Sequence, residues 1–489
     1  MDYGLLVKRL LPEVIMIVTA LVVLAADLSL WRRFPARWRR TVAAFTTSMG
    51  CLMSCAVLSG ELEIGVFYKG MWVFDPQIGL LKEVLVGLIA ATVWIHRETS
   101  FTRHVGEFVL LTVLGGVGAM ILVSTESLLL AFVALELLSL SLYVMTAFAK
   151  SELASVEAGI KYFLFGSVSA ACLLYGISLL YGITGETNIA AMSATLAGKA
   201  GDPLVFLALV LVSVGLGFKV AVAPFHLWAP DTYEGAPTPA AAFVASASKV
   251  ASFFFLAKIS LLGWKTVPGS GGWHAFAPGW SPIWCVMAAA SVVFGNIAAL
   301  AQTRLKRLLA CSAIAHAGYM VTGLLANTPG GERALVYYVV TYAVSSVGAF
   351  AVVAVVEKAH GSDHMEAFNG LGRRDPYLAI CLGVFLLSFA GIPPLAGFFG
   401  KFYLFVAALG TPDSPLSLLW LVVLSAAMSC VALYYYVLVL KRVFVLKPQG
   451  KPVEIEVRWM TRAVLGICSL SILLLGLFPQ SLFDRLVPR

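Results

Sequence analysis

Stretches of about 20 mostly apolar residues recur along almost the whole sequence of 489 residues, and an α-helix needs a stretch of that length to cross a bilayer. Only 12% of the residues are charged and 60% are hydrophobic, whereas soluble proteins are typically about 25% charged and about 45–50% apolar. The sequence therefore predicts an all-α polytopic membrane protein with 14 transmembrane helices. These are expected at 11–31, 41–60, 76–95, 105–124, 127–149, 158–181, 203–228, 238–263, 282–303, 307–327, 333–357, 376–410, 415–440 and 461–480.

The basic residues lie between the apolar stretches, and mostly in alternate loops. By the positive-inside rule, the odd-numbered loops face the cytoplasm and both termini lie on the periplasmic side. The net charge of +8 therefore reports topology, and no nucleic-acid partner is expected. The even-numbered loops hold only Lys69, Lys199, Lys265 and Arg333, whereas the odd-numbered loops hold Arg32, Arg33, Arg37, Arg39, Arg40, Arg97, Arg103, Lys150, Arg304, Lys306, Arg307, Lys358, Arg373, Arg374, Lys441, Arg442, Lys447, Lys451 and Arg458.

Two of the predicted helices carry prolines at bilayer depth, each near a lysine. Lys219 lies five residues before Pro224, and Lys401 follows Pro393 and Pro394 in a span too long for one straight helix. Proline removes a backbone donor, and a broken helix is tolerated in a membrane where the freed groups face protein or water. The breaks fall five spans apart. Because five is odd, a five-helix repeat would be inverted in the membrane, which is typical of transporters.

Five ionisable residues are predicted deep inside the membrane: Glu136, Lys219, Lys249, His316 and Lys401. A charge at the bilayer centre costs at least about 2.5–3.5 kcal/mol on insertion scales, so such a residue is a functional candidate. Burial in general lowers the pKa of a lysine and a neighbouring carboxylate raises it, so a moving carboxylate could load or unload a proton. The set is predicted to transfer protons, with Lys219 as the best partner of Glu136. Structural ion pairs remain an alternative for single lysines, and a hydrogen-bonded core role remains one for His316.

A secondary set of charged residues lies nearer the ends of the predicted helices. For two of its lysines the preferred interpretation is that the side chain extends to the membrane interface, and the same is expected of Lys82 and Glu83. The secondary set is Glu107, Glu157, Lys161 and Lys258, with the interface interpretation applying to Lys161 and Lys258.

The segment 230–239 is rich in proline and glycine and predicts a rigid turn between spans seven and eight. It carries two carboxylates, Asp231 and Glu234. Because they lie in this turn, they are interpreted as structural caps before catalytic acids.

No cofactor or metal site is expected in the chain itself. Each of the eight cysteines lies in an apolar stretch and no two form a CxxC pair, whereas iron–sulfur clusters and structural zinc need clustered thiolates or imidazoles. The phosphate-binding pattern GxxxxGK[ST] is also missing from the sequence, so nucleotide hydrolysis is not expected.

Four segments carry a family resemblance: the lysine–proline stretch 217–229 with the turn after it, the segment 391–403 around Lys401, the segment 296–319 around His316, and 157–163. Together they resemble the antiporter-like membrane subunits of respiratory complex I, the bacterial NADH:quinone oxidoreductase. Within this family the chain resembles the subunit N group in segment 233–249 and in the lysine at 401, where subunit M has glutamate. A long lateral helix like that of subunit L is not expected after the last span.

The resemblance implies a proton-translocating subunit of an enzyme complex, a translocase, with no redox chemistry in this chain. It implies one polytopic domain over 1–489 that contains two inverted five-helix repeats, at 105–263 and 282–440. It also implies that Glu136 and Lys219 form a switching pair, that Lys249 is the central relay, and that Lys401 lies on the outlet side.

The resemblance further implies a place in the bacterial cytoplasmic (inner) membrane, with an M-like subunit on one flank and a K-like subunit on the other. FMN, iron–sulfur clusters and quinone, which carry electrons from NADH, would belong to partner subunits. Two alternatives stay open at this point: a subunit of a multisubunit Na+/H+ antiporter, and a structural scaffold whose buried charges only hold the complex together.

Overall fold

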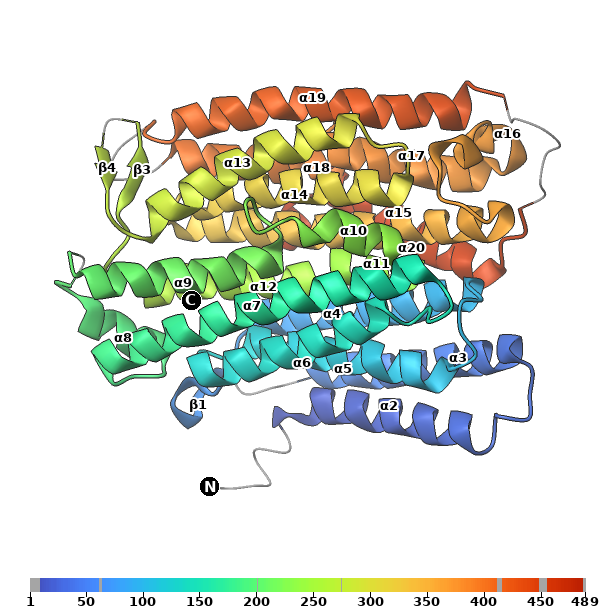
Figure 1. The fold of residues 1–489 in the computed structure, drawn as a ribbon, viewed down its shortest axis with the longest axis horizontal. Helices are drawn as coiled ribbons and strands as arrows, with labels where there is room; N and C mark the ends of the chain where they lie inside the picture. The colour runs from blue at the N-terminus through green and yellow to red at the C-terminus, as the bar shows by residue number, and fades with distance from the viewer. Residues whose placement is uncertain are drawn as a thin grey trace.

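The computed structural model describes residues 9–60, 64–199, 201–273, 275–410, 416–447 and 455–486. Lys451 of the basic loop set, and both ends of the domain predicted over 1–489, therefore lie outside the described residues. Figure 1 shows a bundle of helices that run side by side along its long direction, with the first half of the chain on one side and the second half on the other. Helices α9 to α12 lie between the two halves.

The first half of the bundle contains two long flanking helices, a hairpin and a group of packed helices. Its elements are α2 (Leu11–Leu28), α3 (Ala36–Leu58), β1 (Gly65–Phe67), η1 (Tyr68–Gly70), β2 (Trp72–Phe74), α4 (Pro76–Glu98), α5 (Val105–Ser124), α6 (Leu128–Thr146), α7 (Leu153–Thr184), α8 (Ile189–Leu196), α9 (Pro203–Val220), α10 (Trp228–Gly235), α11 (Thr238–Ala245), α12 (Ala247–Lys258) and η2 (Ile259–Gly263).

The second half repeats the pattern of a hairpin followed by packed helices. Its elements are β3 (Ser270–Gly272), β4 (Ala275–Ala277), α13 (Trp280–Leu300), α14 (Leu305–Leu324), α15 (Pro329–His360), η3 (Met365–Phe368), α16 (Leu371–Arg374), α17 (Pro376–Ala390), α18 (Ala396–Leu409), α19 (Leu419–Phe444), α20 (Trp459–Leu477) and α21 (Gln480–Phe483).

Twelve helices among the described residues are long and apolar enough to cross a membrane. They lie within a few residues of predicted spans, so the predicted class, a mostly helical multi-pass membrane protein, is confirmed. Helix α14 falls outside this group of twelve, and α17 and α18 are shorter apolar helices on either side of a break. Two antiparallel hairpins, β1–β2 and β3–β4, correct the purely helical prediction, because short extended segments join the helices at one end of the bundle.

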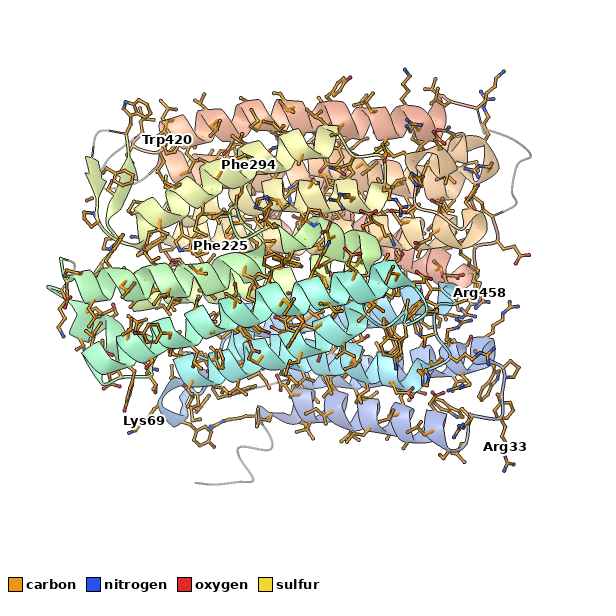
Figure 2. The ribbon with its side chains drawn as sticks, viewed as in Figure 1. Arg33, Lys69, Phe225, Phe294, Trp420 and Arg458 are labelled. Atoms are coloured by element: carbon orange, nitrogen blue, oxygen red, sulfur yellow. The ribbon has the colours of Figure 1, made fainter. Side chains whose placement is uncertain are left out.

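The two ends of the bundle differ in charge. Figure 2 shows Arg33 and Arg458 at one end, and Lys69 and Trp420 at the other. The end with Arg33 also carries the loops after α4, α13 and α15, and these loops together with those of Arg33 and Arg458 hold most of the predicted odd-loop basic residues. We call this end the basic face and the other the hairpin face.

Four helices begin at an aspartate or threonine that is followed directly by proline. In each, the side-chain oxygen accepts a hydrogen bond from a backbone N–H of the first turn, which would otherwise lack a partner. Proline fits the first helical position because its missing N–H has no partner there. These local signals set the starts of α4, α9, α15 and α17, at Asp75–Pro76, Asp202–Pro203, Thr328–Pro329 and Asp375–Pro376.

The most deeply buried helices lie at the centre of the bundle. The segment from α11 to η2 and almost all of α15 are enclosed by other helices, whereas only about a third of the residues in the most apolar stretches of α7, α19 and α20 are buried. Helix α15 packs against α4, α11, α12, α14, α17, α18 and α20. A polar side chain on α12 or α15 therefore lies far from lipid and solvent, while the outer helices present apolar side chains to the membrane.

The middle of the chain departs from prediction in two ways. The segment 230–239 is not a turn throughout, because α10 runs to Gly235 and only the next two residues link it to α11. Span eight is confirmed as a candidate membrane span over Thr238–Gly263, but Ser246, with φ of −118° and ψ of −83°, separates α11 from α12 within it. Prolines at the first turn of a helix are tolerated, so Pro230 and Pro239 start helices here rather than end them.

Candidate functional site

The first broken helix confirms the predicted break at Pro224. Helix α9 ends at Val220, where Ala221 takes a left-handed conformation with φ of 59°. Helix α10 resumes the path at Trp228, and Pro224 lies between the two. The Phe218 carbonyl accepts two hydrogen bonds, from the Ala221 N–H at 3.1 Å and from Trp228 Nε1 at 3.1 Å. The indole of α10 thus adds a contact across the break.

Lys219 extends from the last turn of α9 to helix α6. Its buried Nζ donates a hydrogen bond to Ser139 Oγ at 2.5 Å and lies 3.4 Å from the Tyr143 hydroxyl. Glu136 lies about one turn before Ser139 on α6, and its carboxylate interacts electrostatically with Lys219. Among the described residues the two form no direct ion pair, and Glu136 Oε1 has no hydrogen-bond partner. The switching pair that the resemblance implied stays a prediction, and Ser139 is the residue of α6 that Lys219 contacts most closely.

Lys249 lies at the contact of three central helices. Its buried Nζ donates a hydrogen bond to the Ala313 carbonyl of α14 at 2.7 Å. The Tyr342 ring of α15 lies 5.5 Å from the same nitrogen, measured to the ring centre. The break at Ser246, three residues earlier, begins the helix that presents Lys249. The ammonium thus has neutral partners from α14 and α15.

His316 is enclosed by tyrosines in the middle of the second half. Its Nδ1 lies 2.6 Å from the Tyr338 hydroxyl and its Nε2 lies 3.1 Å from the Tyr436 hydroxyl. Both Lys249 and Lys401 interact with it electrostatically. His316 is therefore a hydrogen-bonded core histidine, as one of the two interpretations held. The second interpretation, that His316 relays protons, is equally compatible with the geometry, because both Lys249 and Lys401 interact with it.

The second broken helix confirms the predicted break at Pro393 and Pro394, which lie between the end of α17 and the start of α18. Gly391 ends α17 with φ of 83°, a conformation that suits glycine because it lacks a Cβ. Lys401 is buried in α18 and reaches back to the freed end of α17. Its Nζ donates three hydrogen bonds, to the carbonyls of Phe389 and Ala390 at 2.9 and 3.1 Å and to Ser429 Oγ of α19 at 2.7 Å.

Two lysines that were expected to extend to the membrane interface are buried instead. Lys258 is 7% exposed, and its Nζ donates to the Val123 and Thr125 carbonyls near the end of α5, at 2.8 and 3.2 Å. Lys82 is 1% exposed and forms an ion pair with Glu13 of α2 at 2.8 Å. The interface interpretation is wrong for both, because neighbouring helices supply polar partners that the sequence spacing alone does not reveal.

The rest of the secondary set forms ion pairs at the ends of helices. Glu107, in the first turn of α5, lies 2.9 Å from His104. Lys161, which is 40% exposed, pairs with Glu157 at 2.7 Å and with Asp231 at 2.9 Å. Lys161 lies at the basic face, which agrees with the prediction that it lies near a helix end.

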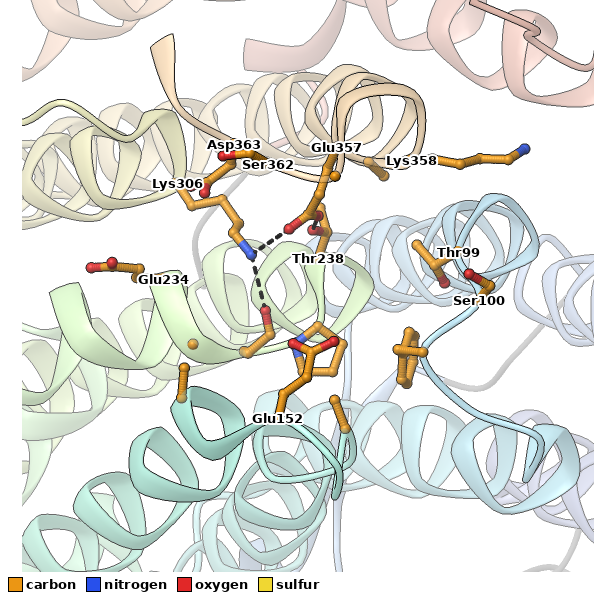
Figure 3. A pocket seen from close by; sticks show the side chains of 18 of the residues that line it. Thr99, Ser100, Glu152, Glu234, Thr238, Lys306, Glu357, Lys358, Ser362 and Asp363 are labelled. Atoms are coloured by element: carbon orange, nitrogen blue, oxygen red, sulfur yellow. Dashed lines mark hydrogen bonds and ion pairs between the residues drawn. The ribbon is translucent and has the colours of Figure 1, made fainter. Parts of the chain in front are cut away.

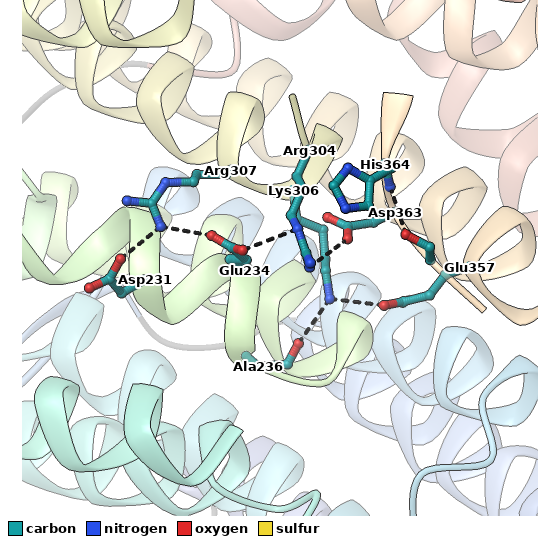
Figure 4. A network of polar contacts seen from close by, with 10 residues as sticks. Asp231, Glu234, Ala236, Arg304, Lys306, Arg307, Glu357, Asp363 and His364 are labelled. Atoms are coloured by element: carbon teal, nitrogen blue, oxygen red, sulfur yellow. Dashed lines mark hydrogen bonds and ion pairs between the residues drawn. The ribbon is translucent and has the colours of Figure 1, made fainter. Parts of the chain in front are cut away.

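A network of ion pairs joins α10 to α14 at the basic face (Figure 4). Arg307 donates from one nitrogen to Asp231 at 2.8 Å and to Glu234 at 2.7 Å. Arg304 lies 3.3 Å from the other oxygen of Glu234. Asp231 and Glu234 are therefore structural, as predicted, but they hold two helices together rather than cap a turn.

Within the described ranges, no group of three or more His, Cys, Asp or Glu side chains is arranged to hold a metal ion. The cysteines there are free thiols. The buried ionisable groups that the fold brings together are lysine, histidine, tyrosine and carboxylate side chains.

Comparison with known proteins agrees with this geometry. A family model described as NADH:quinone oxidoreductase/Mrp antiporter, TM matches residues 125–430, which contain all five residues of the central set. A curated relative from Acidobacterium capsulatum, named NADH-quinone oxidoreductase subunit N 2, is 46% identical over 98% of this chain and 98% of its own length. The chain belongs to the subunit N family of NADH-quinone oxidoreductase.

Solved structures show the fold of this family. A chain of respiratory complex I from Thermus thermophilus with bound aureothin is 33% identical to this subunit N family member, with a TM-score of 0.79 over 97% of this chain and 99% of that one. A chain of the Mrp complex from Dietzia sp. is 19% identical, with a TM-score of 0.81 over 99% and 96%. The second likeness is one of fold alone.

Several polar residues around the central row of this subunit N chain were missed by sequence reasoning. Hydroxyl groups in apolar spans are the signal that could have found them, because a buried hydroxyl needs a partner. Ser139 lies three residues after Glu136, and Tyr338 and Tyr342 lie four apart on α15, so each pair shares a helix face. The full missed set around the row is Ser139, Tyr143, Tyr338, Tyr342, Ser429 and Tyr436.

Proposed function

We propose that this chain is the proton-translocating, antiporter-like membrane subunit of a bacterial NADH:quinone oxidoreductase. The observation that carries the proposal is the row of buried basic groups, Lys219, Lys249, His316 and Lys401, which begins and ends at a broken helix. Buried ionisable groups inside a membrane are expensive and mark ion pathways. The family assignment supports the same function.

The first step assigned to this row is a switch at Lys219. Its ammonium is held by neutral hydroxyls, and the Glu136 carboxylate lies near it without a bond. Bringing the carboxylate closer favours the charged lysine, and withdrawing it favours release of the proton. Lys249 and His316 would pass the proton along the row, and Lys401 would serve the outlet side. Moving one charge against 100 mV costs about 2.3 kcal/mol, so quinone reduction elsewhere must drive the switch.

The proposed topology has 14 transmembrane helices. It adds α14 and the broken pair α17–α18 to the twelve long apolar helices. Two inverted five-helix repeats would span 105–263 and 282–440, each with one helix broken at proline. The basic face would lie in the cytoplasm and both termini on the periplasmic side of the inner membrane, because basic loops remain inside.

The proposed partners are the neighbouring membrane subunits, M-like on one flank and K-like on the other. FMN, the iron–sulfur clusters and quinone would belong to other subunits, and this chain would perform the translocase part of the reaction. The alternative of a Na+/H+ antiporter subunit shares the fold, as the Mrp structure does. The 46% identity to a subunit N relative favours a subunit of NADH:quinone oxidoreductase over a Na+/H+ antiporter subunit.

The test is Lys219→Ala in the assembled complex in native membranes. We expect NADH:quinone turnover and proton translocation to fall together by at least about tenfold, since a positioned proton-transfer group typically contributes about 10²–10⁴-fold. Lys265→Ala, an exposed lysine near the hairpin face, is the matched control. A blot for the assembled complex accompanies both.

Unchanged turnover and pumping in the assembled Lys219→Ala complex would contradict the proposal. Loss of assembly with normal coupling in the complex that remains would favour the scaffold. Sodium-dependent proton exchange without NADH oxidation would favour the antiporter.

A further inference from the structure

A cavity of about 560 Å³ lies at the basic face where the two halves of the bundle meet (Figure 3). A water molecule occupies about 30 Å³ in the liquid, so the cavity has room for roughly ten or more. Its walls come from segments 99–101, 149–154, 234–238, 304–306 and 354–363. The charged side chains around it are Glu152, Glu234, Arg304, Lys306, Glu357, Lys358 and Asp363.

The inner wall of the cavity is formed by an ion pair. Lys306, in the first turn of α14, is only 4% exposed, and its Nζ lies 3.0 Å from Glu357 Oε1 and 3.4 Å from the Ala236 carbonyl. The other oxygen of Glu357 accepts a hydrogen bond from the Thr238 hydroxyl. The pair therefore ties α14 and α15 to the link between α10 and α11, just where the buried segment leading to Lys249 begins.

One face of α15 leads from this pair to the central row. Glu357, Phe350, Ser346 and Tyr342 follow one another at steps of seven or four residues, so they lie on one side of the helix. The 15 residues from Tyr342 to Glu357 rise about 22 Å. The Tyr342 ring lies 5.5 Å from Lys249 Nζ and 5.1 Å from the His316 ring.

Buried polar groups without hydrogen-bond partners lie on α10, opposite the face of α15 that leads from Glu357 to Tyr342. Tyr233 is fully buried on α10, its ring lies 5.9 Å from Phe350, and its side chain also interacts electrostatically with Tyr342. Within the described parts of the chain, neither its hydroxyl nor that of buried Thr232 has a hydrogen-bond partner. Unpaired buried hydroxyls are costly, and water entering from the cavity would satisfy them. The apolar ring of Phe350 keeps the route closed in this structure.

We infer that this cavity is the water-filled vestibule from which the central row takes up protons, and that the Lys306–Glu357 pair holds the proton at its inner wall. The inference rests on the proposed function and deepens it. When the contact between the Glu357 carboxylate and the Lys306 ammonium opens, the carboxylate accepts a proton from a hydronium ion in the cavity water, which becomes water. Passing the proton inward through water past Tyr233 and Tyr342 restores the carboxylate and closes the pair. No other bond changes.

The test compares Glu357→Gln with Glu357→Asp in the assembled complex, followed as NADH:quinone turnover and proton translocation across pH. Proton uptake limits the rate when protons are scarce. We therefore expect turnover and proton translocation in Glu357→Gln to fall about tenfold at about pH 8.5 and to change little at about pH 6. Glu357→Asp should recover most of the loss, because it keeps a carboxylate. Glu366→Gln, an exposed carboxylate in η3 outside the cavity, is the matched control.

Glu357→Gln also leaves Lys306 buried without a counter-charge, so Lys306→Gln/Glu357→Gln is the second variant. It keeps hydrogen-bonding groups and removes both charges, and we expect the same alkaline loss. An assembled double variant with the wild-type pH profile would overturn the inference, and so would failure of both variants to assemble, which would make the pair structural. If Lys219→Ala loses proton translocation while these variants do not, the vestibule inference is contradicted and the proposed function stands. If Lys219→Ala pumps normally, the proposed function itself fails.

Discussion

The two broken helices each carry a buried lysine, but the two lysines are held in different ways. At the first break, Lys219 precedes the gap and reaches to a neighbouring helix, where a serine hydroxyl accepts its hydrogen bond. The Phe218 carbonyl at that break accepts hydrogen bonds from the Ala221 N–H and from the Trp228 indole. At the second break, Lys401 follows the gap and itself satisfies the freed carbonyls, those of Phe389 and Ala390.

The difference separates the duties of the two lysines. Lys401 stabilises the end of α17, so its removal leaves two buried carbonyls without their donor. Lys219 donates to the hydroxyls of Ser139 and Tyr143 on α6 instead of to the carbonyls at its own break. A lysine that does not stabilise a helix end, and that interacts with a carboxylate through space, can change its protonation without unravelling a helix. Lys219 at the first break is therefore suited to a change of protonation, whereas Lys401 at the second break is held in place by the helix end that it stabilises.

The largest expected effect is on stability and comes from Lys401→Met compared with Lys219→Met. Each change keeps an unbranched apolar side chain and removes the ammonium. Lys401→Met should cost about 3 kcal/mol or more, because hydrogen bonds from a charged donor contribute about 1.5–3 kcal/mol each and two acceptors are left buried. Lys219→Met should cost clearly less. Thermal denaturation of the purified complex measures both, and equal losses would contradict the division of duties.

The next effect is on activity and comes from Ser139→Ala. Without the hydroxyl, Lys219 loses the acceptor that holds it beside Glu136, and we expect proton translocation to fall about tenfold, as a loss of about 1.4 kcal/mol would produce. Assembly should remain normal. Ser141→Ala on the same helix is the matched control, since its hydroxyl bonds only to the Leu137 carbonyl. If both variants pump alike, Ser139 does not position the lysine.

The smallest effect is expected from Trp228→Phe. The ring that stacks on Tyr162 at 4.3 Å is replaced by a smaller one, and the N–H that satisfies the Phe218 carbonyl is lost. We expect a loss of about 1 kcal/mol beyond that of ring size. Trp264→Phe controls for ring size, because its buried indole N–H has no hydrogen-bond partner in the part of the chain that the structure describes. Denaturation midpoints that match for the two variants would show that the first break needs no indole donor.

The fold was predictable to the extent that its signals are local. The length of the apolar stretches predicted the membrane helices. The starts of α4, α15 and α17 can be read from short aspartate–proline or threonine–proline motifs. Pro224 and the pair Pro393–Pro394 marked both gaps, because proline cannot donate to a helix wherever it lies. The break at Ser246 carries no such signal, and it was missed.

The sequence by itself determined that the chain spans a membrane many times, which residues are ionisable at bilayer depth, and where two of the helices break. Tertiary structure alone decided the partners: Ser139 for Lys219, the end of α5 for Lys258, and Glu357 for Lys306. The reason is that helix formation depends on neighbours within one turn, whereas a buried charge takes its partner from another helix. Lys358 and Glu98, which are 2.8 Å apart and 260 residues apart in sequence, show how far that choice can reach.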